Sequence, residues 1–83
     1  MPTSPPDTPD LLTQLCQILA SVFDVPAERL SVATRLYELP QWSSLSFIVL
    51  MTAVETRLGL QPDRERAWDA EDIGTLLAVL QDA

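Results

Sequence analysis

The stretch Trp42-Ser43-Ser44-Leu45-Ser46-Phe47 opens the only long apolar run of the chain, and this run decides the fold. After it, apolar residues recur at spacings of three and four. This spacing predicts an amphipathic helix over residues 44–58, closed by Gly59. The face of this helix that we expect to enter the core carries Phe47, Leu50, Met51, Val54 and Leu58.

A second, weakly polar stripe lies on another face of the same helix. It consists of Leu45, Ile48, Val49, Thr52 and Ala53. In one interpretation, the loop before the helix folds over this stripe and buries it. In the other, the stripe docks partner proteins, because the single core of a small domain rarely surrounds a helix completely. We favour the docking surface.

Apolar periodicity predicts two further helices, over residues 10–23 and 72–81. The expected capping residues are Thr8 followed by Pro9 for the first helix, and the pair Asp69 and Asp72 for the last. A structured loop is expected over residues 24–42, and a short turn near 66–70. The prediction is an all-α bundle of three main helices plus a short one, with a long first loop.

Composition limits the classes of partner. The 83 residues carry twelve acidic and five basic side chains, all five of them arginine, for a net charge of -7. No basic patch can form, which excludes nucleic acid and disfavours anionic membranes. The longest apolar run is too short to span a bilayer, and the acids and prolines at the start lead us to expect no signal peptide. We expect a free-standing, monomeric cytoplasmic protein, with a flexible tail over residues 1–9 and one domain over residues 10–83.

The inventory of reactive side chains argues against an enzyme. The chain has no histidine and no lysine, so neither a Ser-His-Asp nor a Ser-Lys arrangement is available to activate a serine. Cys16 is the only cysteine, which excludes an internal disulfide, and its helical neighbours predict that it is buried. No ligand cluster for a metal is visible. If Ser44 is functional, its chemistry is performed by another protein.

Several short motifs follow one another in a recognisable order. Phe23-Asp24-Val25 followed by Leu30 closes the first helix, Ser44-Leu45 heads the apolar helix with Glu55 inside it, Leu58-Gly59-Leu60 ends it, and Asp72-Ile73-Gly74-Thr75-Leu76 opens the last. In this order and spacing, residues 11–80 resemble the acyl carrier protein family.

The resemblance implies a function. In that family, the serine before the leucine carries 4'-phosphopantetheine, attached from coenzyme A by a phosphopantetheinyl transferase with magnesium. The matching residue here is Ser44. The arm holds acyl or aminoacyl groups as thioesters for the enzymes that load and consume them, in polyketide, nonribosomal peptide or related pathways. The residues that we expect to contact such partners are Trp42, Ser43, Leu45, Ile48, Val49 and Thr52.

The chain departs from the family at Ser43, where an aspartate is usual. This leaves Ser43 open as an alternative attachment point, and it leaves open an unmodified carrier-like domain that serves as an interaction module. Simple helix capping is another interpretation of both serines, although no Glu or Gln follows either at the capping-box position. Trp42 is either a loop anchor packed on the domain or a partner contact.

Overall fold

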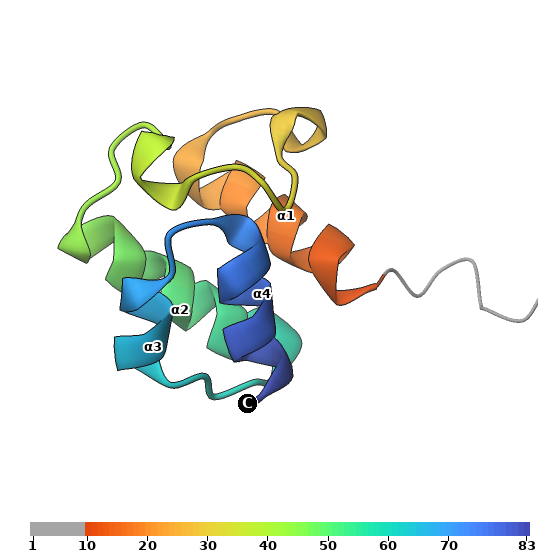
Figure 1. Cartoon of the computed structure of the whole chain (residues 1–83), viewed down its shortest axis with the longest axis vertical. Helices are drawn as coiled ribbons and strands as arrows, with labels where there is room; N and C mark the ends of the chain where they lie inside the picture. The colour runs from red at the N-terminus through yellow and green to blue at the C-terminus, as the bar shows by residue number, and fades with distance from the viewer. Residues whose placement is uncertain (1–9) are drawn as a thin grey trace, which may run out of the picture.

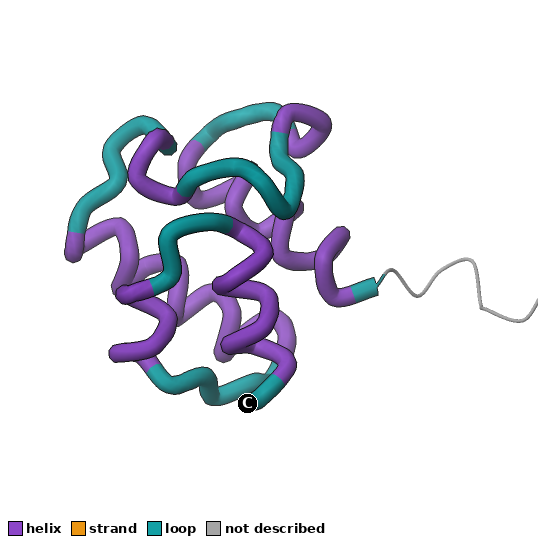
Figure 2. The backbone as a smooth tube through the Cα atoms, viewed as in Figure 1, coloured by secondary structure: helices purple, strands orange, loops and turns teal. Residues whose placement is uncertain are grey.

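Four α-helices form the domain. The computed structural model describes residues 10–83. The elements are α1 (Leu11–Phe23), the short 3-10 turns η1 (Ala27–Arg29) and η2 (Leu36–Glu38), α2 (Ser44–Leu58), α3 (Arg64–Asp69) and α4 (Ile73–Gln81). Figure 1 shows the long connection between α1 and α2 lying across one end of the bundle. No strand occurs within the described residues (Figure 2), which confirms the predicted all-α class.

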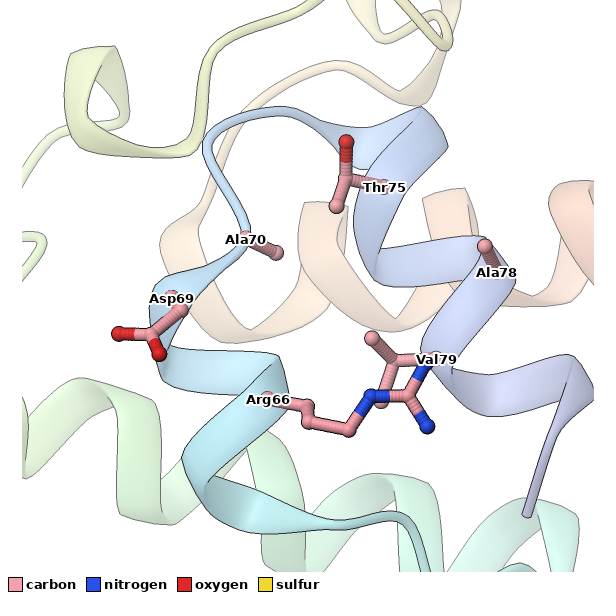
Figure 3. Close-up of a pocket in the computed structure, with 6 residues that line it drawn as sticks. All are labelled: Arg66, Asp69, Ala70, Thr75, Ala78 and Val79. Carbon is pink, nitrogen blue, oxygen red and sulfur yellow. The ribbon is translucent and has the colours of Figure 1, made fainter.

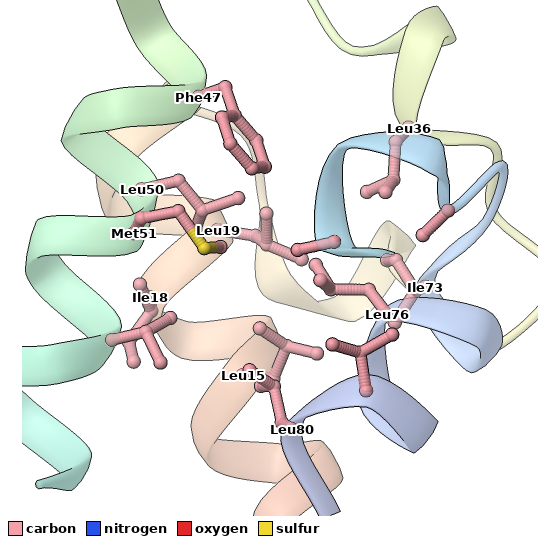
Figure 4. Close-up of a cluster of buried hydrophobic side chains, with 14 of the residues drawn as sticks. Leu15, Ile18, Leu19, Leu36, Phe47, Leu50, Met51, Ile73, Leu76 and Leu80 are labelled. Carbon is pink, nitrogen blue, oxygen red and sulfur yellow. The ribbon is translucent and has the colours of Figure 1, made fainter. Parts of the chain in front are cut away.

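The core lies where α1, α2 and α4 face one another (Figure 4). The side chains almost completely removed from solvent there are Leu15, Ile18, Leu19, Leu36, Leu50, Met51, Val54, Ile73, Leu76 and Leu80. The predicted core face of α2 is confirmed, except that Leu58 is only partly buried at the helix end. Cys16 is buried as predicted, and this burial raises the pKa of its thiol.

Helix capping differs from the sequence prediction at two helices, α1 and α4. Asp10, not Thr8, caps α1, because its carboxylate accepts the Thr13 N–H at 2.8 Å while its own backbone stays extended. Thr8 and Pro9 lie outside the described residues. The proposed capping pair of Asp69 and Asp72 is also wrong. Asp69 is the last residue of α3, and Asp72 alone caps α4 by accepting the Thr75 N–H at 2.8 Å.

The short helix begins earlier than the predicted turn at 66–70. Asp63 explains this start, because its Oδ1 accepts the N–H groups of Glu65 and Arg66 at 3.0 and 3.2 Å. An N-cap at this position allows a helix to begin at Arg64. The backbone turns extended at Ala70, so that α3 ends there and α4 can start in a new direction.

The connection between α1 and α2 is fixed to the start of α4 by backbone hydrogen bonds. The N–H groups of Ile73 and Gly74 donate to the carbonyls of Thr34 and Val32, each at 2.9 Å, and Leu36 N–H donates to the Glu71 carbonyl at 2.9 Å. These bonds satisfy N–H groups of the first turn of α4, which have no partner within the helix. The loop is therefore ordered, as predicted, and its course is set by α4. None of the described helices is long and apolar enough to cross a membrane.

The Asp72 cap gives stability an acid dependence. Hydrogen bonding from Thr75, chiefly from its backbone N–H, holds the pKa of the Asp72 carboxyl below its ordinary value. A carboxyl whose pKa is lower in the folded state than in the unfolded state stabilises the fold at pH values above its unfolded pKa, which is about 3.9. This stabilisation is lost as the pH falls through the folded-state pKa. We expect the free energy of unfolding to fall below about pH 4. Asp72→Asn, which keeps an acceptor oxygen but cannot titrate, should show a shallower fall.

Urea unfolding at a series of pH values measures this effect. Asp69→Asn is the matched control, because Asp69 caps no helix. An Asp72→Asn protein whose stability falls as steeply with acid as that of the parent would contradict the assignment.

Candidate functional site

The start of α2 is held by a reciprocal pair of serines. Ser43 is the N-cap, and its Oγ accepts the Ser46 N–H at 3.2 Å, while the Ser46 Oγ accepts the Ser43 N–H at 2.8 Å. The Ser46 hydroxyl also donates to the Ser43 carbonyl at 3.0 Å. This is a capping box in which serine takes the place of the usual Glu or Gln. The capping box was not predicted from the sequence, because only Glu or Gln was considered as the second residue of the box.

Ser44 differs from its two neighbours in this cluster. It is the first residue of α2 and is exposed to solvent. Within residues 10–83, its hydroxyl makes no hydrogen bond, whereas the hydroxyls of Ser43 and Ser46 are both engaged in the cap. Of the three serine hydroxyls at this helix start, the one at Ser44 is therefore free to react.

An aromatic cluster anchors the segment just before the serines. The ring of Trp42 stacks on that of Trp68 with centroids 5.8 Å apart and planes 10° apart, and it lies 5.6 Å from the ring of Phe23. The Phe47 ring meets Trp68 edge-on at 5.0 Å. Aromatic pairs of this kind contribute about 0.5–1.5 kcal/mol each beyond the burial of area. The loop-anchor interpretation of Trp42 is confirmed, and Trp68 is the partner that sequence reasoning did not pair with it.

A tight turn over residues 39–42 positions Trp42 in this cluster. The Trp42 N–H donates to the Leu39 carbonyl at 3.2 Å, and Gln41 has a left-handed backbone with φ of 63°. With Pro40 as the second residue, this is the pattern of a type II turn, in which glycine is the usual third residue. Gln41 therefore holds a strained conformation two residues before the cap.

The apolar stripe of Leu45, Ile48 and Val49 faces solvent. The exposed fractions of these side chains are 72%, 49% and 50%. The interpretation that the loop buries this stripe is therefore wrong. The loop runs elsewhere because Leu36 and Leu39 enter the core and its backbone bonds to the start of α4.

The two other residues of the predicted stripe differ from each other. Thr52 is exposed, and its hydroxyl donates to the Ile48 carbonyl at 2.9 Å, whereas Ala53 is partly buried against the core. Within α2, Glu55 pairs with Arg64 of α3 at 2.9 Å. Both of these charged side chains are substantially exposed, so the ion pair adds little stability.

A hollow lies beside the serine cluster, between the end of α1 and the start of α2. We call it the serine groove. It has a volume of about 300 Å³ and is lined by Val22, Gln41, Ser43, Leu45, Ser46 and Val49. A second hollow, lined by residues of α3 and α4 (Figure 3), includes Arg66, which pairs with Asp82 at 3.1 Å. None of the predicted site residues lines this second hollow.

Comparison with known families shows to which family the chain belongs. The family model described as "Phosphopantetheine attachment site" matches residues 13–80, which is most of the chain. The chain belongs to this family. It is a member of the carrier proteins, which bear covalent 4'-phosphopantetheine. A search of curated proteins finds no match to the carrier.

The residues at the start of α2 fit this group. The Ser44 hydroxyl is exposed and unpartnered within the described residues, as a phosphodiester linkage requires. The N–H groups of Ser44 and Leu45 also lack hydrogen-bond partners there, and they point from the positive end of a 15-residue helix. Such a helix end suits a phosphate. Across residues 10–83 of the carrier, no three His, Cys, Asp or Glu side chains gather into a metal-binding group.

The reciprocal cap makes a prediction about stability. Ser43→Ala removes the acceptor for the Ser46 N–H, and we expect it to lower the free energy of unfolding by about 1 kcal/mol. Ser43→Asp keeps the cap and places a negative charge at the positive helix end, so that it should be at least as stable as the parent. Ser44→Ala is the matched control, because the Ser44 hydroxyl holds nothing in place.

Urea unfolding of the three variants tests this ranking. A Ser43→Ala carrier as stable as the parent, or a Ser44→Ala carrier less stable than Ser43→Ala, would show that the cap is not the function of Ser43.

Proposed function

We propose that Ser44 is the residue of this carrier to which 4'-phosphopantetheine is attached. The observation that carries the proposal is the difference among the clustered serines: Ser43 and Ser46 use their hydroxyls in the cap, and Ser44 does not. Ser44 also stands directly before Leu45, the spacing of the family motif. The attachment domain would be the one over residues 10–83.

The chain supplies an acceptor and a platform, and the attaching enzyme supplies the catalysis. In the attachment reaction, the Ser44 Oγ forms a bond to the phosphorus of coenzyme A that bears the pantetheine, and the bond from that phosphorus to the bridging oxygen breaks. The leaving group is adenosine 3',5'-bisphosphate. The proton of the Ser44 hydroxyl would pass to a base of the transferase, because no side chain among residues 10–83 accepts a hydrogen bond from that hydroxyl and the chain has no histidine or lysine. Once bound, the group supplies the thiol that holds acyl or aminoacyl cargo as a thioester.

Partner enzymes would meet the carrier on one face of α2. We define the docking surface as Leu45, Ile48 and Val49, with Trp42, Ser43 and Thr52 at its rim. About half or more of the surface of each of these three apolar side chains is exposed. The first of them, Leu45, directly follows Ser44 in the chain. Burial of such side chains is the main source of affinity in the centre of an interface. The net charge of -7 would act on approach, toward partners with basic surfaces.

The enzymes that fit this role are a phosphopantetheinyl transferase, a loading enzyme for an acyl or aminoacyl group, and a synthase or transferase that consumes it. The pathways that we propose are those of polyketides, nonribosomal peptides or related products. The carrier would act as a monomer, because its docking surface must be open to each enzyme in turn, and it would itself catalyse nothing.

One observation favours a second candidate, an unmodified interaction module. Ser43 stands where the family usually has aspartate, and its hydroxyl is engaged in the cap. A partner that requires the aspartate would not modify this chain. The apolar docking surface would then act without the arm.

Modification is tested directly by intact mass. After incubation with coenzyme A, magnesium and a broad-specificity transferase, we expect the parent and Ser43→Asp to gain one phosphopantetheine and Ser44→Ala to gain none. Ser43→Asp is preferred to Ser43→Ala as the control because it keeps the cap. If Ser44→Ala still gains the mass, the attachment site is wrong. If the parent gains no mass with any such transferase, the interaction module replaces the carrier proposal.

The docking surface makes a separate prediction. Ile48→Ala should reduce loading by the cognate enzyme several-fold, because truncating a central apolar anchor costs about 1–2 kcal/mol of binding energy. Ile48→Glu should reduce it further. Loading of the parent should change little with added salt, since apolar burial is not screened.

The assay is a loading rate across a salt series, with circular dichroism to confirm folding. Val32 provides the matched control: its exposed fraction is 48%, against 49% for Ile48, and it lies on the loop rather than on α2. Val32→Ala and Val32→Glu should load normally. If both Ile48 variants load normally while salt abolishes loading, docking is electrostatic and the proposed surface is wrong.

A further inference from the structure

The serine groove lies within one residue of the proposed attachment point. Ser43 and Leu45, the two chain neighbours of Ser44, both line it. Ser44 itself does not line the hollow, but adjacent Cα atoms are about 3.8 Å apart, so the backbone to which the arm would be tethered lies directly beside the lining residues.

The lining of the groove is half apolar and half polar. Val22, Leu45 and Val49 supply aliphatic side chains, and Gln41 supplies an amide, while the hydroxyls of Ser43 and Ser46 are engaged with each other. A pantetheine arm has the same alternation: a dimethyl-substituted carbon, a hydroxyl and two amide groups. The volume of about 300 Å³ is at the lower end of the range for small-molecule sites. It has room for part of the arm but not for a long acyl chain in addition.

Gln41 gives the groove a feature that packing alone does not explain. Its backbone is left-handed, with φ of 63°, at the turn position where glycine would be unstrained. A side chain is nevertheless present there, and it is exposed at the groove. Strained residues of this kind occur at ligand clamps, where the side chain has a function that outweighs the cost.

Building on the proposed attachment at Ser44, we infer that the serine groove is the resting site of the pantetheine arm, with the Gln41 side-chain amide as its polar contact. Because the arm would be covalently attached to the chain, even a site of low affinity would hold it for much of the time. A short flexible linker gives an effective concentration of about 1 mM, so a site with a dissociation constant of about 1 mM is half filled. Leu45 and Val49 belong to both the groove and the docking surface. A partner that covers them displaces the arm from the groove and receives it.

Nuclear magnetic resonance of the full chain tests the site. Protein bearing the arm is prepared with coenzyme A and a broad-specificity transferase, and attachment at Ser44 is confirmed by mass. We expect nuclear Overhauser contacts from the arm to the methyl groups of Val22 and Val49, and a shift of the Gln41 side-chain amide relative to the unmodified protein. Val22 is the decisive reporter, because it lies on α1 and is distant in sequence from the modified residue. Val32 should show no contact.

Variants at Gln41 separate the amide from the turn. Gln41→Gly relieves the strained backbone and removes the amide. It should weaken binding of the arm about three-fold or more, the effect of one lost hydrogen bond, so that a half-filled site becomes about a quarter filled or less and the contacts to Val22 fall about two-fold or more. Gln41→Asn keeps an amide and tolerates the left-handed backbone, so it should retain part of the contacts. The mass measurement shows that each variant is still modified.

The outcomes distinguish this inference from the proposed function. A mass gain at Ser44 without contacts to Val22 overturns the resting site and leaves the attachment site standing. Contacts that persist unchanged in Gln41→Gly overturn the role of the amide. If no mass is gained, the proposed attachment fails, and the resting site fails with it.

Discussion

The stack of Trp42 on Trp68 is the contact on which the functional end of the molecule depends. Their rings lie 5.8 Å apart and almost parallel, and Phe23 and Phe47 close around them. These four side chains come from the end of α1, the long connection, α2 and α3. One cluster therefore joins four segments of the chain, from Phe23 at the end of α1 to Trp68 in α3. It also fixes the backbone one residue before the cap of α2.

The route of the long connection follows from this anchor and from its bonds to α4. Leu36 and Leu39 enter the core, and the backbone of Val32 and Thr34 accepts N–H groups from the first turn of α4. These contacts draw the loop away from the apolar stripe on α2. Leu45, Ile48 and Val49 are thus exposed because the loop is held elsewhere, and not because the loop is too short to cover them.

The site shows how a small carrier divides its polar groups. The hydroxyls and backbone N–H groups of Ser43 and Ser46 hydrogen-bond to each other, which fixes the start of the helix. Ser44 therefore has a free hydroxyl on a fixed backbone. Under the proposed attachment at Ser44, the chain would need no general base of its own, since the attaching enzyme would supply the catalysis. What it must supply is a well-placed oxygen and an open surface beside it. Both are present at the first turn of α2.

The sequence by itself determined the helices and the core. The spacing of three and four residues predicted the observed bounds of α2 and most of its buried face. It could do so because the apolar residues of an amphipathic helix recur on the side that packs against the core. It also placed Ser44 at a helix start. Capping was less predictable, since Asp10, Asp63 and Asp72 compete with other polar residues one or two positions away, and local propensity does not rank them. Only the tertiary structure decided that Trp42 stacks on Trp68 and that the second stripe of α2 stays exposed. Each of these depends on contacts between segments distant in the chain, and the spacing of residues within one helix carries no information about such contacts.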